Sequence, residues 1–241
     1  MRLDKFICKS TLLNRLQAQT LIREGQVMVN QKVIKEANAQ VHANNCVTMN
    51  KQILIARPPR YLMIHKPANT VCSNVDEVYP SVFSAVGLYS EENHRQYDVA
   101  LMHIAGRLDA DTTGLVLATD DGHWSFNITR PDQHCQKVYR VNLRNQISQQ
   151  SISAIQQGIK LQGEDKLTRP AIIQLLSPKQ VLLTITEGKF HQVKRMFAAI
   201  GNKVEALHRQ QIGKVKLDIP PGVWRELNQQ EIDSFTESNT L

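Results

Sequence analysis

Two adjacent prolines divide this chain of 241 residues into a short first segment and a long second one. They lie in the stretch Arg57-Pro58-Pro59-Arg60. Because proline lacks an N–H and restricts the residue before it, no regular helix can run through such a stretch. Charge divides at the same place, since residues 1–60 contain ten Lys and Arg against three Asp and Glu, whereas the rest of the chain contains 19 of each kind. We therefore predict a basic unit of residues 1–56 and a neutral unit of residues 61–241.

The composition excludes several classes of protein. A hydrophobic content of 41% suits a globular chain, and no apolar run approaches the roughly 18 residues of a membrane helix. The first ten residues, MRLDKFICKS, carry charges where a signal peptide has its apolar core. The four cysteines are far apart and form no C-x-x-C pair, which disfavours a disulfide framework or a structural zinc site. We expect a cytoplasmic protein that does not contact membranes.

The basic segment shows two helical patterns followed by a hairpin pattern. Apolar residues recur at helical spacing in residues 1–10 and again in residues 14–24. Asn14 is suited to cap the second helix, and Gly25 is suited to end it. The stretch VMVNQKVI then alternates as two short strands around an Asn30-Gln31 turn.

Residues 1–50 resemble the S4 domain of ribosomal and RNA-modifying proteins. Two positions depart from that pattern, because Asn14 stands where Ser is common and Gln31 where Gly is common. The resemblance implies RNA binding, and a basic face without a partner is the alternative. Contacts to phosphate would be independent of base sequence, and the residues expected to make them are Arg2, Lys5, Lys9, Arg15 and Arg23.

The long segment mixes strands and helices without regular alternation. Strand patterns occur at YLMIHK, ending before Pro67, and at residues 115–119, 138–143 and 181–186. Helical patterns occur near 148–157 and 190–201. This order predicts an α+β fold with a mixed, mainly antiparallel sheet.

Four aspartates lie within the stretch GRLDADTTGLVLATDDG at residues 106–122. Asp120 and Asp121 precede a helical pattern and are suited to cap free amides. Asp111 begins a polar turn before a strand. Asp109 lies between Leu108 and Ala110 and is the candidate for chemistry, although Asp109 and Asp111 also match a D-x-D metal site, a tripeptide that is common by chance.

The same stretch resembles the central motif of pseudouridine synthases, in the RsuA family. Three further stretches agree in order and spacing: YLMIHKPANTVCS at 61–73, HCQKVYRV at 134–141 and TEGKFHQVKRMFAAIGNKVEALHR at 186–209. With the S4-like start, the resemblance covers almost the whole chain. It implies an isomerase that converts a uridine of 16S ribosomal RNA, by resemblance uridine 516, to pseudouridine.

The resemblance also implies roles for individual residues. Asp109 matches the essential aspartate, which acts as nucleophile or base. Tyr139 matches the tyrosine that lies against the target base, and Lys194 matches the basic residue beside the carboxylate. Arg107, Arg195 and Arg209 are the expected RNA contacts of the long segment. Neither a cofactor nor a metal ion is needed, because the reaction gains and loses no atoms.

Helical geometry supports the position of Lys194. If residues 190–200 form one helix at about 100° per residue, Lys194 lies at the rim of an apolar arc, and His191 and Arg195 lie on the polar face. The apolar arc consists of Phe190, Val193, Met196, Phe197 and Ile200. A rim lysine can bury its stem and direct its ammonium into a cleft. No histidine is assigned a catalytic role.

The leading hypothesis is therefore a monomeric synthase that acts on 16S RNA or on a 30S assembly intermediate. Three alternatives remain open at the level of sequence. The first is a large-subunit synthase of the same family, and the second is an RNA-binding assembly factor without catalytic activity. The third is a metal-dependent transferase that uses Asp109 and Asp111.

Overall fold

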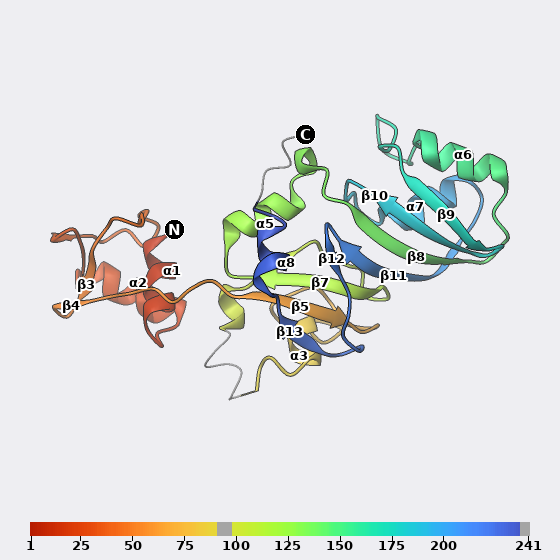
Figure 1. Ribbon diagram of the computed structural model, residues 1–241. Coiled ribbons are helices and arrows are strands. Elements are labelled where there is room, and N and C mark those ends of the chain that lie inside the picture. The colour runs from red at the N-terminus through yellow and green to blue at the C-terminus, as the bar shows by residue number, and fades with distance from the viewer. Residues whose placement is uncertain (91–97, 237–241) are drawn as a thin grey trace. The chain divides into compact units, whose positions relative to one another are not determined.

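The computed structural model describes residues 1–90 and 98–236 (Figure 1). Within them the chain forms two compact units, Met1–Pro59 and Arg60–Leu241. The division falls inside the Arg57–Arg60 stretch. Each unit has its own core and is described separately.

The small unit packs two helices against a four-stranded antiparallel sheet of order β2-β1-β3-β4. Its elements are α1 (Leu3–Ser10), α2 (Arg15–Arg23), β1 (Val27–Val29), β2 (Lys32–Val33), β3 (Val47–Met49) and β4 (Gln52–Ile53). The side chain of Asn14 caps α2 and forms a reciprocal capping box with Gln17. Asn30 and Gln31 have φ values of 49° and 68°, as a two-residue hairpin turn requires. Both helices and this first hairpin agree with the expectation from sequence.

The second hairpin of the small unit was not predicted. It joins β3 to β4 through Asn50 and Lys51, whose φ values of 51° and 65° repeat the geometry of the first turn. Asn-Lys is a weaker turn signal than Asn-Gly, because lysine carries a Cβ that disfavours positive φ. The pairing of β1 with β3 supplies the context that holds the turn.

A buried carboxylate organises the basic side chains of the small unit. Asp4 is fully buried on α1 and accepts hydrogen bonds from Arg2 at 2.8 Å, Arg15 at 3.1 Å and Gln19 at 3.1 Å. Burial alone would raise the pKa of Asp4, but these hydrogen bonds outweigh it and lower that pKa below its ordinary value. Arg15 and Gln19 therefore join α2 to Asp4 of α1, whereas Arg2 contacts Asp4 from the N-cap of α1 itself.

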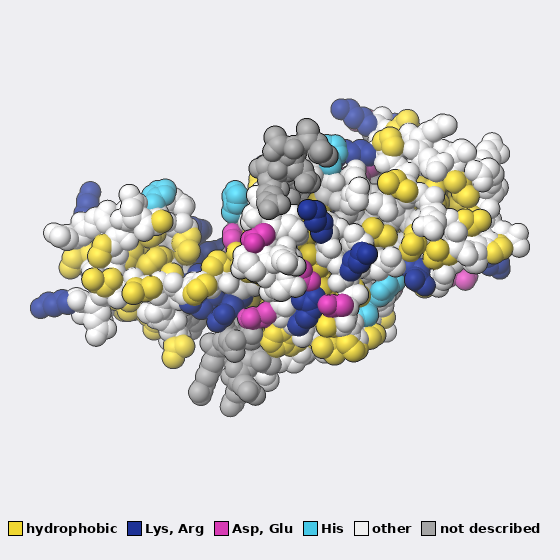
Figure 2. All heavy atoms as spheres, viewed as in Figure 1, with side chains coloured by type: hydrophobic (Ala, Val, Ile, Leu, Met, Phe, Trp, Pro, Cys, Tyr) yellow, Lys and Arg dark blue, Asp and Glu magenta, His cyan; other side chains and the backbone are white. Residues whose placement is uncertain are grey.

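The three other predicted phosphate contacts differ in exposure. Lys9 is buried, which is a correction to its expected role, because a buried ammonium cannot reach a phosphate at the surface. Arg23 is exposed and Lys5 is half-buried. Figure 2 shows Lys and Arg side chains projecting from the visible face of the small unit.

Replacing Asp4 by Asn is expected to destabilise the small unit at pH 7 by roughly 1–3 kcal/mol, because charge-assisted hydrogen bonds are lost. The wild-type contribution is present above the unfolded pKa of about 3.9 and is lost as the pH falls through the lower folded pKa. The variant should therefore lose less stability on acidification. NMR of the α1 amides measures both effects, with the exposed Glu24→Gln as control. Equal acid sensitivity of Asp4→Asn and wild type would contradict this account.

The large unit is built on one mixed sheet, which confirms the α+β class. In the described part of the chain it has nine strands, of which seven follow the order β13-β5-β7-β11-β8-β10-β9, while β12 pairs with β11 and β6 with β7. All these pairs are antiparallel except β7 with β11. The strands are β5 (Tyr61–Lys66), β6 (His103–Ala105), β7 (Thr113–Thr119), β8 (Lys137–Leu143), β9 (Ile172–Ser177), β10 (Gln180–Ile185), β11 (Val204–Ile212), β12 (Val215–Lys216) and β13 (Trp224–Glu226).

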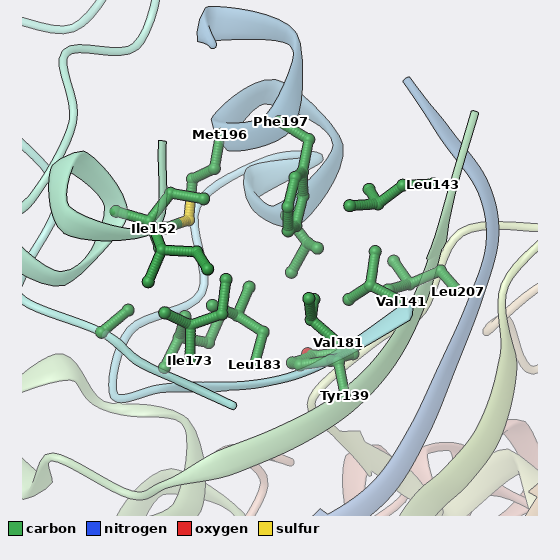
Figure 3. Packing of buried hydrophobic residues seen from close by; sticks show 14 of the residues in the cluster. Tyr139, Val141, Leu143, Ile152, Ile173, Val181, Leu183, Met196, Phe197 and Leu207 are labelled. Carbon is green, nitrogen blue, oxygen red and sulfur yellow. The ribbon is translucent and has the colours of Figure 1, made fainter. Parts of the chain in front are cut away.

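Helices pack against this sheet, and the buried residues between them form separate core clusters. The helices are α3 (Val82–Ala85), α5 (Gly122–Thr129), α6 (Gln149–Gln157), α7 (Gln192–Ala199) and α8 (Gln229–Asp233), with short 3₁₀ turns at Val99–Leu101 and Pro131–Gln133. Strands β5 and β7 are buried on both faces, since Leu62 and Ile64 belong to one core and Met63 to another. In Figure 3, Met196 and Phe197 of α7 point toward β8 and β10, where they pack with Val141, Val181 and Leu183.

The aspartates of turns behave as predicted at the end of β7. The Asp121 side chain accepts hydrogen bonds from the His123 and Trp124 amides and thereby caps α5. Asp120 accepts a hydrogen bond from the Arg60 amide at 3.0 Å. No described helix is long and apolar enough to cross a membrane.

Candidate active site

The loop of residues 106–112 joins β6 to β7 and carries Asp109. The carbonyl oxygen of Asp109 accepts a hydrogen bond from the Thr112 amide at 3.1 Å, so Asp109 begins a tight turn. The Asp109 side chain lies outside regular structure and is 28% exposed. Its position therefore depends on whatever holds the loop.

A buried lysine holds one end of this loop. The ammonium of Lys66, at the end of β5, donates to the carbonyl oxygens of Pro67 at 3.0 Å, Ala110 at 3.0 Å and Thr112 at 2.8 Å. Lys66 is fully buried, and this burial lowers its pKa from the ordinary value. Its three N–H donors are satisfied by three backbone acceptors, which fixes the turn after Asp109.

A buried arginine holds the other end. Arg209 of β11 is 1% exposed and donates to the carbonyl oxygens of Leu115 at 2.8 Å, Arg107 at 3.5 Å and Gly106. The backbone of Arg209 also approaches β7 so closely that a Cβ on Gly114 would lie 2.2 Å from the Arg209 oxygen. Glycine is required there both by this contact and by a φ of +114°.

The carboxylate of Asp109 lies between two basic side chains. Its Oδ2 is 3.0 Å from Lys194 Nζ, and its Oδ1 is 3.3 Å from His191 Nε2. Lys194 Nζ also lies 2.7 Å from Asp111 Oδ1. Burial alone would lower the pKa of Lys194, but the hydrogen bonds to Asp111 and Asp109 outweigh it and raise that pKa. The hydrogen bond from Lys194 lowers the pKa of Asp111, so this cation stays charged next to two carboxylates.

Lys194 lies on α7 as predicted, but that helix starts later than the sequence indicated. It begins at Gln192, after His191 at a φ of +47°, and Phe190 is 75% exposed instead of belonging to the apolar arc. The backbone reversal at His191 separates Phe190 from the helix and directs the imidazole toward Asp109. The sequence alone gave His191 no role, because its neighbour in space is 82 positions away in the chain.

Tyr139 completes the arrangement from β8. It is the cross-strand partner of Arg209 in the β8–β11 register, and Arg209 Nη1 lies 3.3 Å from its hydroxyl oxygen. A cavity of about 510 Å³ is lined by Asp109, Tyr139, Lys194 and His191, among others. The structure thus brings together the three residues that the sequence singled out, from the β6–β7 loop, β8 and α7.

The arginines expected to contact RNA lie in three different environments. Arg107 is exposed and lines the cavity. Arg195 lies 3.3 Å from Glu164 and donates to the Phe190 carbonyl oxygen at 3.0 Å, so it ties α7 to the loop before it. Arg209 requires a correction, because its buried guanidinium is used by loop carbonyls and cannot meet a phosphate at the surface.

This arrangement has a defined chemical capacity. A carboxylate with a cation 3.0 Å from one oxygen can act as a nucleophile or a base, and the cation can stabilise negative charge that develops nearby. Tyr139 is 7% exposed and lines the cavity, and its ring is of suitable size to stack on a planar base. Asp109 and Asp111 both contact the Lys194 ammonium. In a D-x-D metal site the two carboxylates would instead bind a metal ion, so here the lysine takes the position of that ion.

Comparison with known proteins identifies the class. The model of the RNA pseudouridylate synthase family matches residues 60–199, and the model of the S4 domain matches residues 1–45. The chain therefore belongs to the RNA pseudouridylate synthase family, and both resemblances seen in the sequence are confirmed.

Individual relatives are similar over nearly their whole length. The ribosomal small subunit pseudouridine synthase A of Vibrio parahaemolyticus is 45% identical, over 97% of this chain and 99% of its own. The protein of the same name from Escherichia coli strain K12 is 42% identical, again over 97% and 99%. A crystal structure of a pseudouridylate synthase, 41% identical, superposes with a TM-score of 0.69 over 98% of this chain and 99% of that one.

Proposed function

We propose that this protein converts one uridine of small-subunit ribosomal RNA to pseudouridine, with uridine 516 of 16S RNA as the expected target. The small unit binds RNA, and the cavity of the large unit receives the uridine. The observation that carries the proposal is the Asp109–Lys194 pair, 3.0 Å apart, in a cavity that Tyr139 also lines. The names of the relatives support the choice of RNA.

The geometry supports a role for each of the three side chains. The reaction breaks the bond between N1 and C1′, turns the uracil and joins C5 to C1′; C5 then loses its proton and N1 gains one, so no atom is gained or lost overall. Asp109 serves as the nucleophile or base, and Lys194 stabilises charge on the carboxylate and the detached uracil. Tyr139 stacks on the base, an interaction worth about 1–3 kcal/mol per base. The uridine must leave its stack to enter the cavity.

The reaction requires no redox change and no added group. We therefore propose that it proceeds without a cofactor or a metal ion, in a monomer that works in the cytoplasm. Full activity in EDTA is the expected result, and loss of activity on chelation would favour the metal-dependent alternative.

The test supplies the protein with a 16S transcript, a partly assembled 30S particle and a 23S transcript, and maps pseudouridine with carbodiimide. One new site in 16S RNA or in the 30S particle is the expected result. A site confined to 23S RNA would show that the protein is a large-subunit synthase. Tight RNA binding with no isomerisation on any substrate would show that it is an assembly factor without catalytic activity.

Exchange of Lys5 and Arg23 for Gln should weaken RNA binding through the small unit. The slope of log K against log salt should fall by roughly 1.4, at about 0.7 for each contact to single-stranded RNA. Arg2 and Arg15 are left intact because they hold Asp4. The control replaces the exposed Lys160 and Lys179 of the large unit. An equal change of slope in both double variants would argue against the small unit as the RNA-binding module.

Replacing Lys194 by Met should lower kcat by about 10²–10³, because a stabilising charge beside the reacting carboxylate is lost. Lys194→Arg keeps the charge and should retain more activity than Lys194→Met. Single-turnover rates measure the chemical step separately from RNA binding, with the exposed Lys179→Met as control. A Lys194→Met variant that is impaired only in KM would show that Lys194 contacts RNA without assisting the reaction.

A further inference from the structure

Lys137 is a buried lysine in the same cavity that the proposed reaction does not use. It is 7% exposed and lines the cavity together with Tyr139 and Ile185. Every second residue of β8 is buried, namely Lys137, Tyr139, Val141 and Leu143. Lys137 is therefore the first residue on the strand face that packs into the apolar core. Its cross-strand partners are Ile185 and Ile212, both buried. An ammonium among such neighbours requires acceptors.

The structure provides fewer acceptors than this ammonium can use. A lysine carries three N–H donors. Across residues 1–90 and 98–236, Lys137 donates to one acceptor, the carbonyl oxygen of Cys135 at 3.0 Å. Lys66, buried in the same unit, donates to three carbonyl oxygens. Burial lowers the pKa of Lys137 from its ordinary value, which is the direction expected of an ammonium short of partners.

An acceptor that enters the cavity can use the remaining N–H donors of Lys137. Residues 137 and 139 are two apart on a strand, so their side chains lie on one face, roughly 7 Å apart along it. Uracil presents two carbonyl oxygens, O2 and O4, at the edge of its ring and no other strong acceptor once N1 is substituted. A base stacked on Tyr139 would therefore bring a carbonyl edge within the reach of a long, flexible lysine side chain.

We propose that Lys137 donates a hydrogen bond to the O4 carbonyl oxygen of the uracil that stacks on Tyr139, and so acts as a specificity-determining residue. This inference rests on the proposed function. Cytosine carries an amino group in place of O4, so a donor at that position discriminates against it. Charge that spreads onto the carbonyl oxygens when the N1 bond breaks would also be stabilised by the same donor.

The test measures kcat/KM of wild type and Lys137→Met on 16S RNA, free or assembled into a partial 30S particle, that contains uridine, 2-thiouridine or 4-thiouridine at the target position. Sulfur is a poorer acceptor than oxygen, so wild type should discriminate against 4-thiouridine. Lys137→Met should lose roughly ten- to a hundredfold on uridine, as expected for a lost charge-assisted hydrogen bond. Its activity on the affected analogue should change much less, so the selectivity ratio should collapse.

Two further variants make the result decisive. Lys160→Met is the matched control, because Lys160 also donates to one backbone carbonyl, that of Asp165, but is exposed. It should leave both activity and selectivity unchanged. Lys137→Gln keeps an N–H donor without the charge, and it should show reduced selectivity even if the Met variant does not fold.

The outcomes separate this inference from the proposed function. Collapse of the ratio for 4-thiouridine supports it. Collapse for 2-thiouridine alone overturns it, because cytosine also carries O2 and a donor to that atom gives no discrimination. Activity lost in equal proportion on all three substrates overturns it and leaves Lys137 with a structural role at Cys135. A changed salt dependence with an unchanged ratio also overturns it, in favour of a phosphate contact. If wild type modifies none of the uridine substrates, the proposed function itself fails.

Discussion

Replacement of Asp109 by Asn is expected to lower the rate of pseudouridine formation by at least about 10⁴-fold, the scale seen when a reacting group is removed. The amide has nearly the shape of the carboxylate and can still contact Lys194, but it is neither a nucleophile nor a base. RNA affinity should not fall, because the change removes a negative charge from a site that receives a polyanion. Single-turnover assays at saturating enzyme, with carbodiimide mapping of the product, measure the rate.

Asp111→Asn is the matched control for this experiment. Asp111 also lies beside Lys194, at 2.7 Å, but it is exposed at the outer side of the turn. We expect a loss of about tenfold or less, because the ion pair positions Lys194 while Asp109 remains. Similar losses in the two variants would mean that the pair of carboxylates matters only as a support for Lys194. An Asp109→Asn variant with wild-type activity would refute the catalytic proposal.

Replacement of Arg209 by Met is expected to have the largest effect on stability. It leaves the carbonyl oxygens of Gly106, Arg107 and Leu115 without their buried donor. At about 1–3 kcal/mol for each unsatisfied group, the large unit should lose at least about 3 kcal/mol. For a domain of this size that corresponds to a fall in Tm of roughly 6–12 °C. Activity should fall as well, because the loop that carries Asp109 loses the hydrogen bonds that hold its first residues.

Two variants distinguish this account from a general loss of charge. Arg209→Lys keeps the charge but not the planar fork of donors, so it should recover little of the lost stability. Arg140→Met removes an exposed arginine from the same sheet, and its Tm should stay close to that of wild type. Differential scanning calorimetry measures each Tm. An Arg209→Met variant with the Tm of wild type would show that water or a rearranged loop satisfies the three carbonyl groups.

Local chemistry predicted the elements that depend on neighbouring residues. Asn14 and Gln17 cap α2 within one turn, Asn30 and Gln31 form the two-residue turn of a hairpin, and β5 ends at Pro67. In each case the decisive interaction spans a few positions of the chain. The sequence was therefore sufficient for these elements and for the mixed class of the sheet.

The supports of the candidate site could not be predicted in this way. Lys66 and Arg209 lie on strands far from the loop in sequence, and their donors meet backbone carbonyls that carry no sequence signal. In the sequence Arg209 is one more basic residue beside a histidine, which is why a phosphate contact was expected. The turn at His191 was missed for a related reason, because a positive φ at a histidine depends on the contacts around it.

The way in which the Asp109 loop is held has a consequence for protein engineering. Lys66 and Arg209 bind main-chain oxygens, which every amino acid possesses, so these hydrogen bonds do not depend on the identity of the side chains in the loop. Arg107, which projects from this loop, can therefore be exchanged without dismantling the scaffold around Asp109. Libraries randomised at that position would sample altered RNA preferences on a fixed catalytic frame.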